Sequence, residues 1–181
     1  MNEKLKTEET EVIKLAYQLS DLRKNYAKTL SDRITVNLKE LNFNNISFEV
    51  SVNSAKENLN RDGIDTVDFL VSFNPGEPVK SLDLVASGGE RSRFMLALKT
   101  VMADKEEIKT LIFDEIDSGI SGKTAWNVSQ KMALLGREHQ LICITHLPQI
   151  AAMADTHFLI EKISSSESTV TEIKKLDEQE S

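Results

Sequence analysis

The stretch from residue 9 to residue 41 contains neither glycine nor proline, the two residues that most readily interrupt a helix. Its apolar residues recur at intervals of three and four, beginning with Val12, Leu15, Leu19, Leu22 and Tyr26. That spacing is typical of the contact positions of a coiled coil. The stripe continues, at intervals closer to four, through Leu30, Ile34, Leu38 and Leu41. The pattern predicts one long helix, and two interpretations stay open: a coiled-coil arm, or an amphipathic helix lying on a globular core.

The segment after this helix alternates apolar and polar residues, as half-buried β-strands do. The alternation involves Ile46, Phe48, Val50 and Val52 and, after a polar loop, Val67, Phe69, Val71 and Phe73. We expect the two strands to pair antiparallel, and Asn74-Pro75-Gly76 to end the second strand in a turn.

From Leu82 onward, segments with helical periodicity alternate with short apolar runs. The pattern predicts helices over 88–103, 121–136 and 148–154, and strands over 111–113, 141–145, 157–162 and 168–174. Buried strands separated by helices are typical of parallel sheets with crossover connections. We therefore predict an α/β fold with a mainly parallel sheet and flanking helices, preceded by the long helix.

The composition limits the classes of function. The chain has 181 residues and a net charge of −7, so any contact with nucleic acid requires a local basic patch. Cys143 is the single cysteine, lies in an apolar run and is expected to be a buried structural thiol. No segment is long and apolar enough to cross a membrane, and the first residues lack the apolar region of a signal peptide. The cytosol is the expected compartment.

The triplet Gly122-Lys123-Thr124 matches the end of the phosphate-binding P-loop, G-x-x-x-x-G-K-[ST]. The first glycine of that pattern would stand at position 117, which is Asp117. The preceding apolar run is followed by two carboxylates, which repel the phosphates that a P-loop attracts. We therefore expect the triplet to begin a helix with Ser121 as its N-cap.

The segment ASGGERSRFMLALK contains a possible anion site. Ser87 and Glu90 fit the capping box of a helix N-terminus, an interpretation that needs no ligand. The capping box leaves Gly88 and Gly89 unexplained, because glycines in a first helical turn weaken the helix by up to about 1 kcal/mol each. Bare backbone at a helix N-terminus suits the close approach of an anion.

The segment TLIFDEIDSG places two carboxylates directly after an apolar strand. In α/β folds this carboxyl edge of the sheet is where ligands bind. Asp114 is therefore a candidate for holding Mg²⁺, through water, and Glu115 is a candidate general base. A solvated acidic turn is the alternative.

A second apolar strand, in LICITHLPQIAAMAD, ends in Thr145-His146. His146 is expected at the same sheet edge as Asp114 and Glu115, either as a structural or as a catalytic residue. His139 and His157 are expected to be structural, because three histidines and one cysteine show no spacing of metal ligands.

Together, these segments resemble the ATPase head of the SMC-like branch of ABC-type ATPases, whose heads carry a coiled-coil arm. Ser87-Gly88-Gly89-Glu90 resembles the ABC signature motif, and Leu111 to Glu115 resembles Walker B with the catalytic glutamate. Asp117 stands in the D-loop position and His146 in the position of the switch histidine. The resemblance covers most of 82–162, and the long helix fits the returning arm.

The resemblance implies the C-terminal lobe of such a head, with an arm over 1–41, the head over 42–175 and a disordered tail over 176–181. It implies ATP and Mg²⁺ as cofactors, with Asp114 as the metal residue, Glu115 activating water and His146 supporting the γ-phosphate. In the family two heads enclose ATP, so Ser87, Gly88, Gly89 and Glu90 are expected to contact nucleotide held by the other head. Asp117 is expected to couple the two sites.

The Walker A motif of these ATPases lies before the coiled coil, and this sequence contains no such motif. The chain is therefore expected not to hydrolyse ATP alone. The partners implied are the N-terminal half of the same ATPase, a second head in a homodimer, and DNA, the last by resemblance alone. An incomplete sheet predicts an exposed edge and exposed apolar surface.

Two other hypotheses stay open. The first is that the chain is a non-enzymatic dimerisation or interaction module, which the missing Walker A motif favours. The second is that the chain belongs to another head of the SMC-like group. The intact set of Ser87 to Glu90, Asp114, Glu115 and His146 favours an ATPase, because a docking surface does not require all of these residues.

Overall fold

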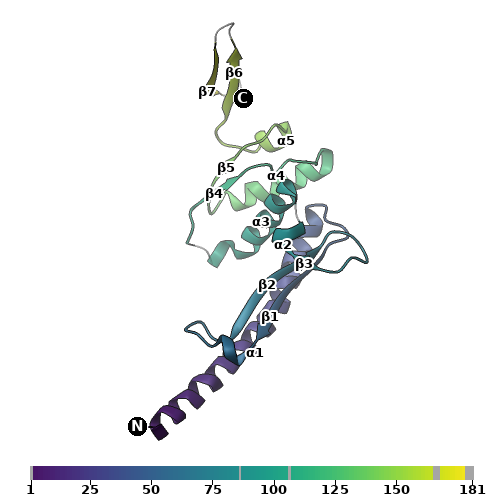
Figure 1. Ribbon diagram of the computed structural model, residues 1–181. Helices are drawn as coiled ribbons and strands as arrows, with labels where there is room; N and C mark the ends of the chain where they lie inside the picture. The colour runs from purple at the N-terminus through teal and green to yellow at the C-terminus, as the bar shows by residue number, and fades with distance from the viewer. Residues whose placement is uncertain (1, 86, 106, 165–167, 178–181) are drawn as a thin grey trace. The chain divides into compact units, whose positions relative to one another are not determined.

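The computed structural model describes residues 2–85, 87–105, 107–164 and 168–177, and these form two compact units that divide after Val101 (Figure 1). The first unit contains α1 (Asn2–Glu40), β1 (Ser47–Ser54), η1 (Lys56–Asn58), β2 (Asp65–Ser72), β3 (Lys80–Ser81), α2 (Leu82–Val85) and α3 (Gly88–Met102, whose last residue lies past the division). The second contains η2 (Ala103–Lys105), β4 (Thr110–Phe113), α4 (Gly122–Leu135), β5 (Gln140–Cys143), α5 (Pro148–Ala151), β6 (Phe158–Ser164) and β7 (Thr169–Lys175).

The long helix α1 is confirmed, and its two halves differ in burial. Toward its C-terminal end, Ile34 and Leu38 are fully buried in the core of the first unit. In the N-terminal part the predicted coiled-coil stripe is exposed, at Val12, Leu15, Leu19, Leu22 and Tyr26. The buried residues of this part are instead small, namely Ala16, Ser20 and Ala27, and Ser20 contacts Ser54 of β1. The C-terminal part of the helix therefore lies on a globular core, and a coiled-coil arm stays a prediction for the N-terminal part.

The predicted antiparallel pair is β1 and β2, with β3 as a third strand, in the order β1-β2-β3. Phe48 and Val50 are buried on one face of β1, and Phe48 pairs with Val71 of β2. The turn that follows contains Gly76 with a φ of 82°, a backbone conformation that glycine adopts without strain.

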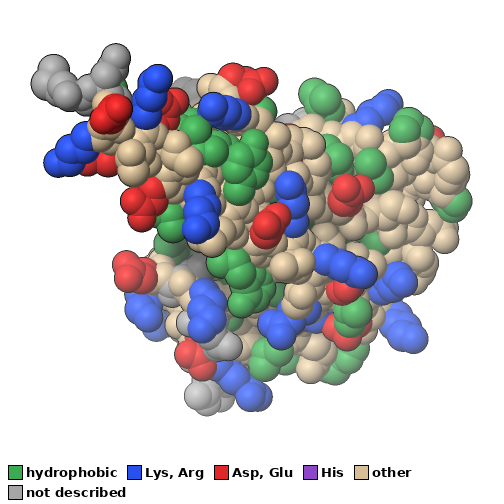
Figure 2. Space-filling model, turned by 90° about the horizontal axis from the view of Figure 1, so that it is seen from below, with side chains coloured by type: hydrophobic (Ala, Val, Ile, Leu, Met, Phe, Trp, Pro, Cys, Tyr) green, Lys and Arg blue, Asp and Glu red, His purple; other side chains and the backbone are tan. Residues whose placement is uncertain are grey.

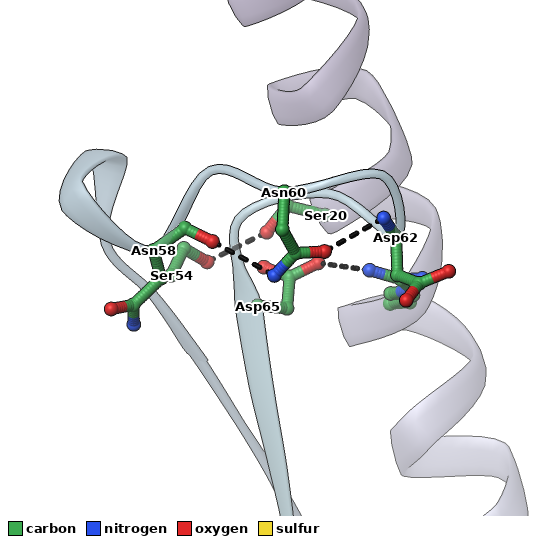
Figure 3. A network of polar contacts seen from close by, with 7 residues as sticks. Ser20, Ser54, Asn58, Asn60, Asp62 and Asp65 are labelled. Carbon is green, nitrogen blue, oxygen red and sulfur yellow. Dashed lines mark hydrogen bonds and ion pairs between the residues drawn. The ribbon is translucent and has the colours of Figure 1, made fainter.

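Polar contacts fix α1 to the end of β1 and the start of β2 (Figure 3). Ser20 Oγ lies 2.7 Å from Ser54 Oγ, and Arg23 Nη1 donates to Asp65 Oδ2 at 3.0 Å. Burial raises the pKa of the Asp65 carboxyl, but hydrogen bonds from Ser20, Arg23 and Ser54 and the charge of Arg23 hold it below its usual value. The arm helix and the hairpin are thus joined by an ion pair as well as by packing.

The helix α3 forms part of the core of the first unit. Phe94 and Leu96 are fully buried, and the ring of Phe94 meets the ring of Phe48 edge-on with centroids 5.1 Å apart. Arg93 is also buried, with its guanidinium 5.5 Å from the centre of the Phe43 ring. Burial lowers the pKa of Arg93, against the opposing charge of Glu90.

In the second unit β4 and β5 form a parallel pair in which Phe113 lies opposite Cys143, and α4 belongs to the crossover between them. Leu111 and Phe113 are buried, whereas Ile112 and Ile142 are exposed. One face of the pair is therefore covered and the other is not, as expected for an incomplete sheet. The strand predicted to reach Thr145 ends at Cys143, and the helix predicted to reach Ala154 ends at Ala151.

The last two predicted strands form the antiparallel hairpin β6–β7, whose side chains are all exposed. The α/β fold class is confirmed, but the sheet was predicted to be mainly parallel, and among the described residues only β4–β5 pairs parallel, whereas β1-β2-β3 and β6–β7 are antiparallel. Residues 178–181 of the expected disordered tail lie outside the described residues. Within the described part, no helix is long and apolar enough to cross a membrane.

Candidate functional site

The predicted anion site in the first unit begins with the capping box at the start of α3. Ser87 Oγ donates to Glu90 Oε2 at 2.8 Å, the N–H of Ser87 donates to the same oxygen at 2.9 Å, and the Glu90 N–H donates to Ser87 Oγ at 3.3 Å. Ser87 and Gly88 are exposed and accessible to an anion, whereas the predicted site residue Gly89 is buried. The hydroxyl of Ser87 has one proton, which it donates to Glu90, so a hydrogen bond from this hydroxyl to an anion requires that proton to turn away from Glu90.

In the second unit, Asp114 and Glu115 follow β4 directly and both are exposed. The N–H of Glu115 donates to Asp114 Oδ1 at 2.9 Å. Glu115 has a φ of 57°, in the left-handed region that non-glycine residues rarely adopt. Residues in this region cluster at active sites, because the surrounding structure must hold them there. The backbone thus turns both carboxylates out at the end of the strand.

Asp117 is only 5% exposed and accepts hydrogen bonds at one oxygen, Oδ2. The hydroxyl of Thr145 donates to it at 2.5 Å and the N–H of His146 at 2.8 Å. Burial raises the pKa of the Asp117 carboxyl, but these hydrogen bonds and the nearby His146 outweigh that effect and hold it below its usual value. Asp117 therefore stays ionised inside its own unit.

The residue after Thr145, His146, has a side chain that is 76% exposed, and its Nδ1 lies 3.1 Å from Asp117 Oδ2. The N–H of Ile144 donates to the carbonyl of Phe113 at 3.0 Å, which continues the parallel pairing past the end of β5. The carboxyl ends of β4 and β5 thus lie side by side, as predicted, with Asp114 and Glu115 after one and His146 after the other.

Thr145 was not predicted as a site residue. Its hydroxyl donates to Asp117 and accepts the N–H of Leu147 at 3.1 Å, so it shapes the loop that carries His146. The only signal in the sequence is a hydroxyl residue placed directly before the histidine at a strand end.

The GKT triplet lies in the first turn of α4, with Ser121 at the N-cap position, as predicted. The side chain of Ser121 makes no capping hydrogen bond. A buried aspartate, Asp117, occupies the position where a P-loop has its first glycine, so the loop between β4 and α4 does not match a P-loop.

Two further histidines and the single cysteine of this unit have surroundings that indicate a structural role. His157 Nε2 lies 2.6 Å from the carbonyl of Ala151, and His139 is 7% exposed. Cys143 is half-buried, and burial together with the charges of Asp117 and Asp114 raises the pKa of its thiol to about 11. Among the described residues, no group of three or more His, Cys, Asp and Glu side chains has the arrangement of a metal site. A single carboxylate such as Asp114 suits Mg²⁺ that is also held by water and by nucleotide phosphates.

Comparison with known proteins gives a consistent result. The chain is 43% identical over 179 residues to the DNA repair protein RecN of Bacillus subtilis, covering 91% of this chain and 31% of that protein. The RecN of Treponema pallidum is 43% identical over 166 residues, and that of Vibrio cholerae is 39% identical over 165. The chain is RecN-like in sequence. No family model matches it.

The solved structures that are similar are SMC heads. The Smc head domain with a coiled coil and joint from Pyrococcus yayanosii aligns with 98% of this chain and 33% of that chain, at a TM-score of 0.62 and 21% identity. The Smc head domain with an extended coiled coil from Pyrococcus furiosus gives a TM-score of 0.56 at 19% identity, over 96% of this chain and 42% of that chain. The fold of this RecN-like chain is therefore similar to that of part of an Smc head domain. The chain spans about a third of the length of the RecN proteins that it matches.

Proposed function

We propose that this chain is the C-terminal portion of the ATPase head of a RecN-like protein that acts in DNA double-strand-break repair and recombination. The observation that carries the proposal is the meeting of two strand ends in the second unit, one with Asp114 and Glu115 and the other with His146. Similarity to RecN at about 40% identity, against about 20% for the SMC heads, favours RecN over another SMC-like head.

The chemistry proposed is ATP hydrolysis by general-base catalysis. Glu115 activates the attacking water, since its exposed carboxylate stands at the edge where the fold binds ligands. Asp114 holds Mg²⁺ through water, and His146 supports the γ-phosphate with a ring that is largely exposed. The bound metal would neutralise charge on the phosphates.

The first turn of α3 supplies the second phosphate contact. Ser87, Gly88 and Gly89 contact the γ-phosphate of ATP held by another head, with Glu90 fixing the serine through the capping box. A helix N-terminus favours anions by its dipole and its free N–H groups. The proposed active assembly is a head-to-head homodimer in which Asp117 couples the two nucleotide sites.

Turnover requires a segment that holds the β-phosphate of ATP. These 181 residues contain no G-x-x-x-x-G-K-[ST] motif, so the segment proposed for this role is one equivalent to the N-terminal half of the ATPase. The exposed Ile112 and Ile142 on one face of β4–β5 offer that segment an apolar surface. DNA is the proposed macromolecular substrate by similarity to RecN. On the face shown in Figure 2, lysine and arginine side chains are interspersed with acidic ones, so this face carries no uniformly basic patch.

ATP turnover tests the proposal. The chain is assayed alone and mixed with a separately expressed N-terminal half that carries a P-loop. Turnover is expected only in the mixture, and Glu115→Gln is expected to abolish it. Glu138→Gln, which changes an exposed glutamate in the turn after α4, serves as the matched control and keeps full turnover.

A non-enzymatic interaction module remains the second candidate, because the coiled-coil stripe of α1 is exposed, as at Leu15, Leu22 and Tyr26. A mixture that assembles, as shown by co-elution, yet does not turn over ATP would reject the ATPase and favour the interaction module.

A further inference from the structure

The acidic residue Asp117 connects the two strand ends of the proposed catalytic site. It stands in the turn after β4, two residues beyond Glu115, and its side chain reaches the loop after β5. Its Oδ2 atom accepts from the Thr145 hydroxyl at 2.5 Å and from the His146 N–H at 2.8 Å, and it lies 3.1 Å from His146 Nδ1. Three groups of one dipeptide thus converge on a single carboxylate oxygen.

The burial of this carboxylate makes these contacts strong. Asp117 is 5% exposed, so water competes little for its oxygens. Hydrogen bonds to an ionised acceptor are roughly twice as strong as those between neutral groups. The hydroxyl of Thr145 also accepts the Leu147 N–H at 3.1 Å, which extends the network along the loop. The backbone around His146 is therefore held by groups on both sides.

The position of the ring follows from the same oxygen. A carboxylate oxygen only accepts hydrogen bonds, so the nitrogen that faces it at 3.1 Å is favoured to carry a proton. The negative charge of the carboxylate at this distance favours the tautomer of the imidazole that carries its proton on Nδ1. With the proton on Nδ1, the second nitrogen, Nε2, is left for a ligand on a side chain that is 76% exposed.

We propose that Asp117 is a positioning residue for His146, which it orients within the same head by holding the Thr145–His146 backbone and by keeping the ring proton on Nδ1. The importance of this orientation for ATP rests on the function proposed above. An effect of Asp117 on a second nucleotide site would then pass through His146.

The tautomer of His146 tests the inference directly. Long-range ¹H–¹⁵N spectra of the ¹⁵N-labelled chain, recorded where titration shows the imidazoles to be neutral, distinguish Nδ1–H from Nε2–H. The ring signals that are missing from the spectrum of His146→Gln are assigned to the imidazole of His146. His157 provides an internal contrast, because its Nε2 lies 2.6 Å from a carbonyl that only accepts, so that Nε2–H is expected there.

The expected result is Nδ1–H for His146 in the wild-type chain and loss of that preference in Asp117→Ala. Asp155→Ala, which removes an exposed carboxylate from the same unit, is expected to leave the His146 spectrum unchanged. If Asp117→Ala does not fold, Asp117→Asn replaces it, and a weakened Nδ1–H preference is expected. An Nε2–H ring in the wild type, or an Nδ1–H ring that no change at Asp117 affects, would overturn the inference.

Turnover in the mixture of halves provides a second readout. Asp117→Ala is expected to lower kcat by about 10- to 100-fold when His146 is present, as loss of a partner that orients a functional histidine does. In a His146→Gln background it is expected to have no further effect, because both changes remove one interaction. Losses that multiply would contradict a role through His146. Absence of turnover in the wild-type mixture would reject the proposed function, whereas the spectra would still decide the role of Asp117.

Discussion

The anchoring of α3 by Phe94 leads to a quantitative prediction. Phe94 is fully buried, and its ring meets that of Phe48 with centroids 5.1 Å apart. Replacing a buried phenylalanine by alanine removes the transfer free energy of the ring and leaves a cavity, which together cost about 3–5 kcal/mol. Phe94→Ala is therefore expected to lower the free energy of unfolding of the first unit by about that amount. Phe94→Leu keeps more of the volume and is expected to lower it less.

Urea unfolding followed by far-UV circular dichroism measures this loss. Because α1 has 39 residues, the helical signal reports chiefly on the first unit, whereas the fluorescence of Trp126 reports on the second. Leu84→Ala is the control, because Leu84 is 79% exposed and surface changes stay within about 0.5 kcal/mol. A loss below about 1 kcal/mol for Phe94→Ala would refute the conclusion that this ring fixes α3, and with it Ser87 to Glu90, to the sheet.

Three further predictions concern protonation and backbone strain. Because burial and then the charges of Asp117 and Asp114 raise the pKa of Cys143 to about 11, iodoacetamide at pH 8 is expected to modify it slowly in the folded chain and rapidly in urea, as measured by mass spectrometry. The pKa of Asp65 is lowered in the folded state, so its contribution to stability is present above the unfolded value of 3.8 and is lost as the pH falls through the folded value. The urea midpoints of the wild type and Asp65→Asn are therefore expected to differ by a constant amount between pH 5 and 7 and to converge in stronger acid; a constant difference down to about pH 2 would contradict this. Glu115→Gly relieves a φ of 57° and is expected to stabilise the second unit by up to about 1 kcal/mol, although it removes the proposed base. The expected observation is a higher urea midpoint for the change in Trp126 fluorescence.

The elements with strong local periodicity could be predicted from the sequence. The long helix, the β1–β2 pair and α4 follow from the spacing of apolar residues, which depends only on neighbours along the chain. The predicted ends of helices and strands were less accurate, because tertiary contacts decide where each one ends. The strand β5 ends at Cys143 because the Thr145 hydroxyl and the His146 N–H are turned toward Asp117, a residue 28 positions earlier than Thr145.

The site itself was partly predictable for a similar reason. An apolar run followed by Asp114-Glu115, and another followed by Thr145-His146, predict two groups at one sheet edge once the strands are parallel. The partner of Asp117 was not predictable, since any of several groups at the strand ends would satisfy a carboxylate in that turn. Burial selects among them, because a charge that is 5% exposed must be matched by donors within its own unit. The donors come from the dipeptide that carries His146, so Asp117, two residues after the proposed base, is joined to the residue that would contact the γ-phosphate. A substitution at Asp117 is therefore expected to act on the strand end that carries His146, although the Asp117 side chain is nearly inaccessible to solvent.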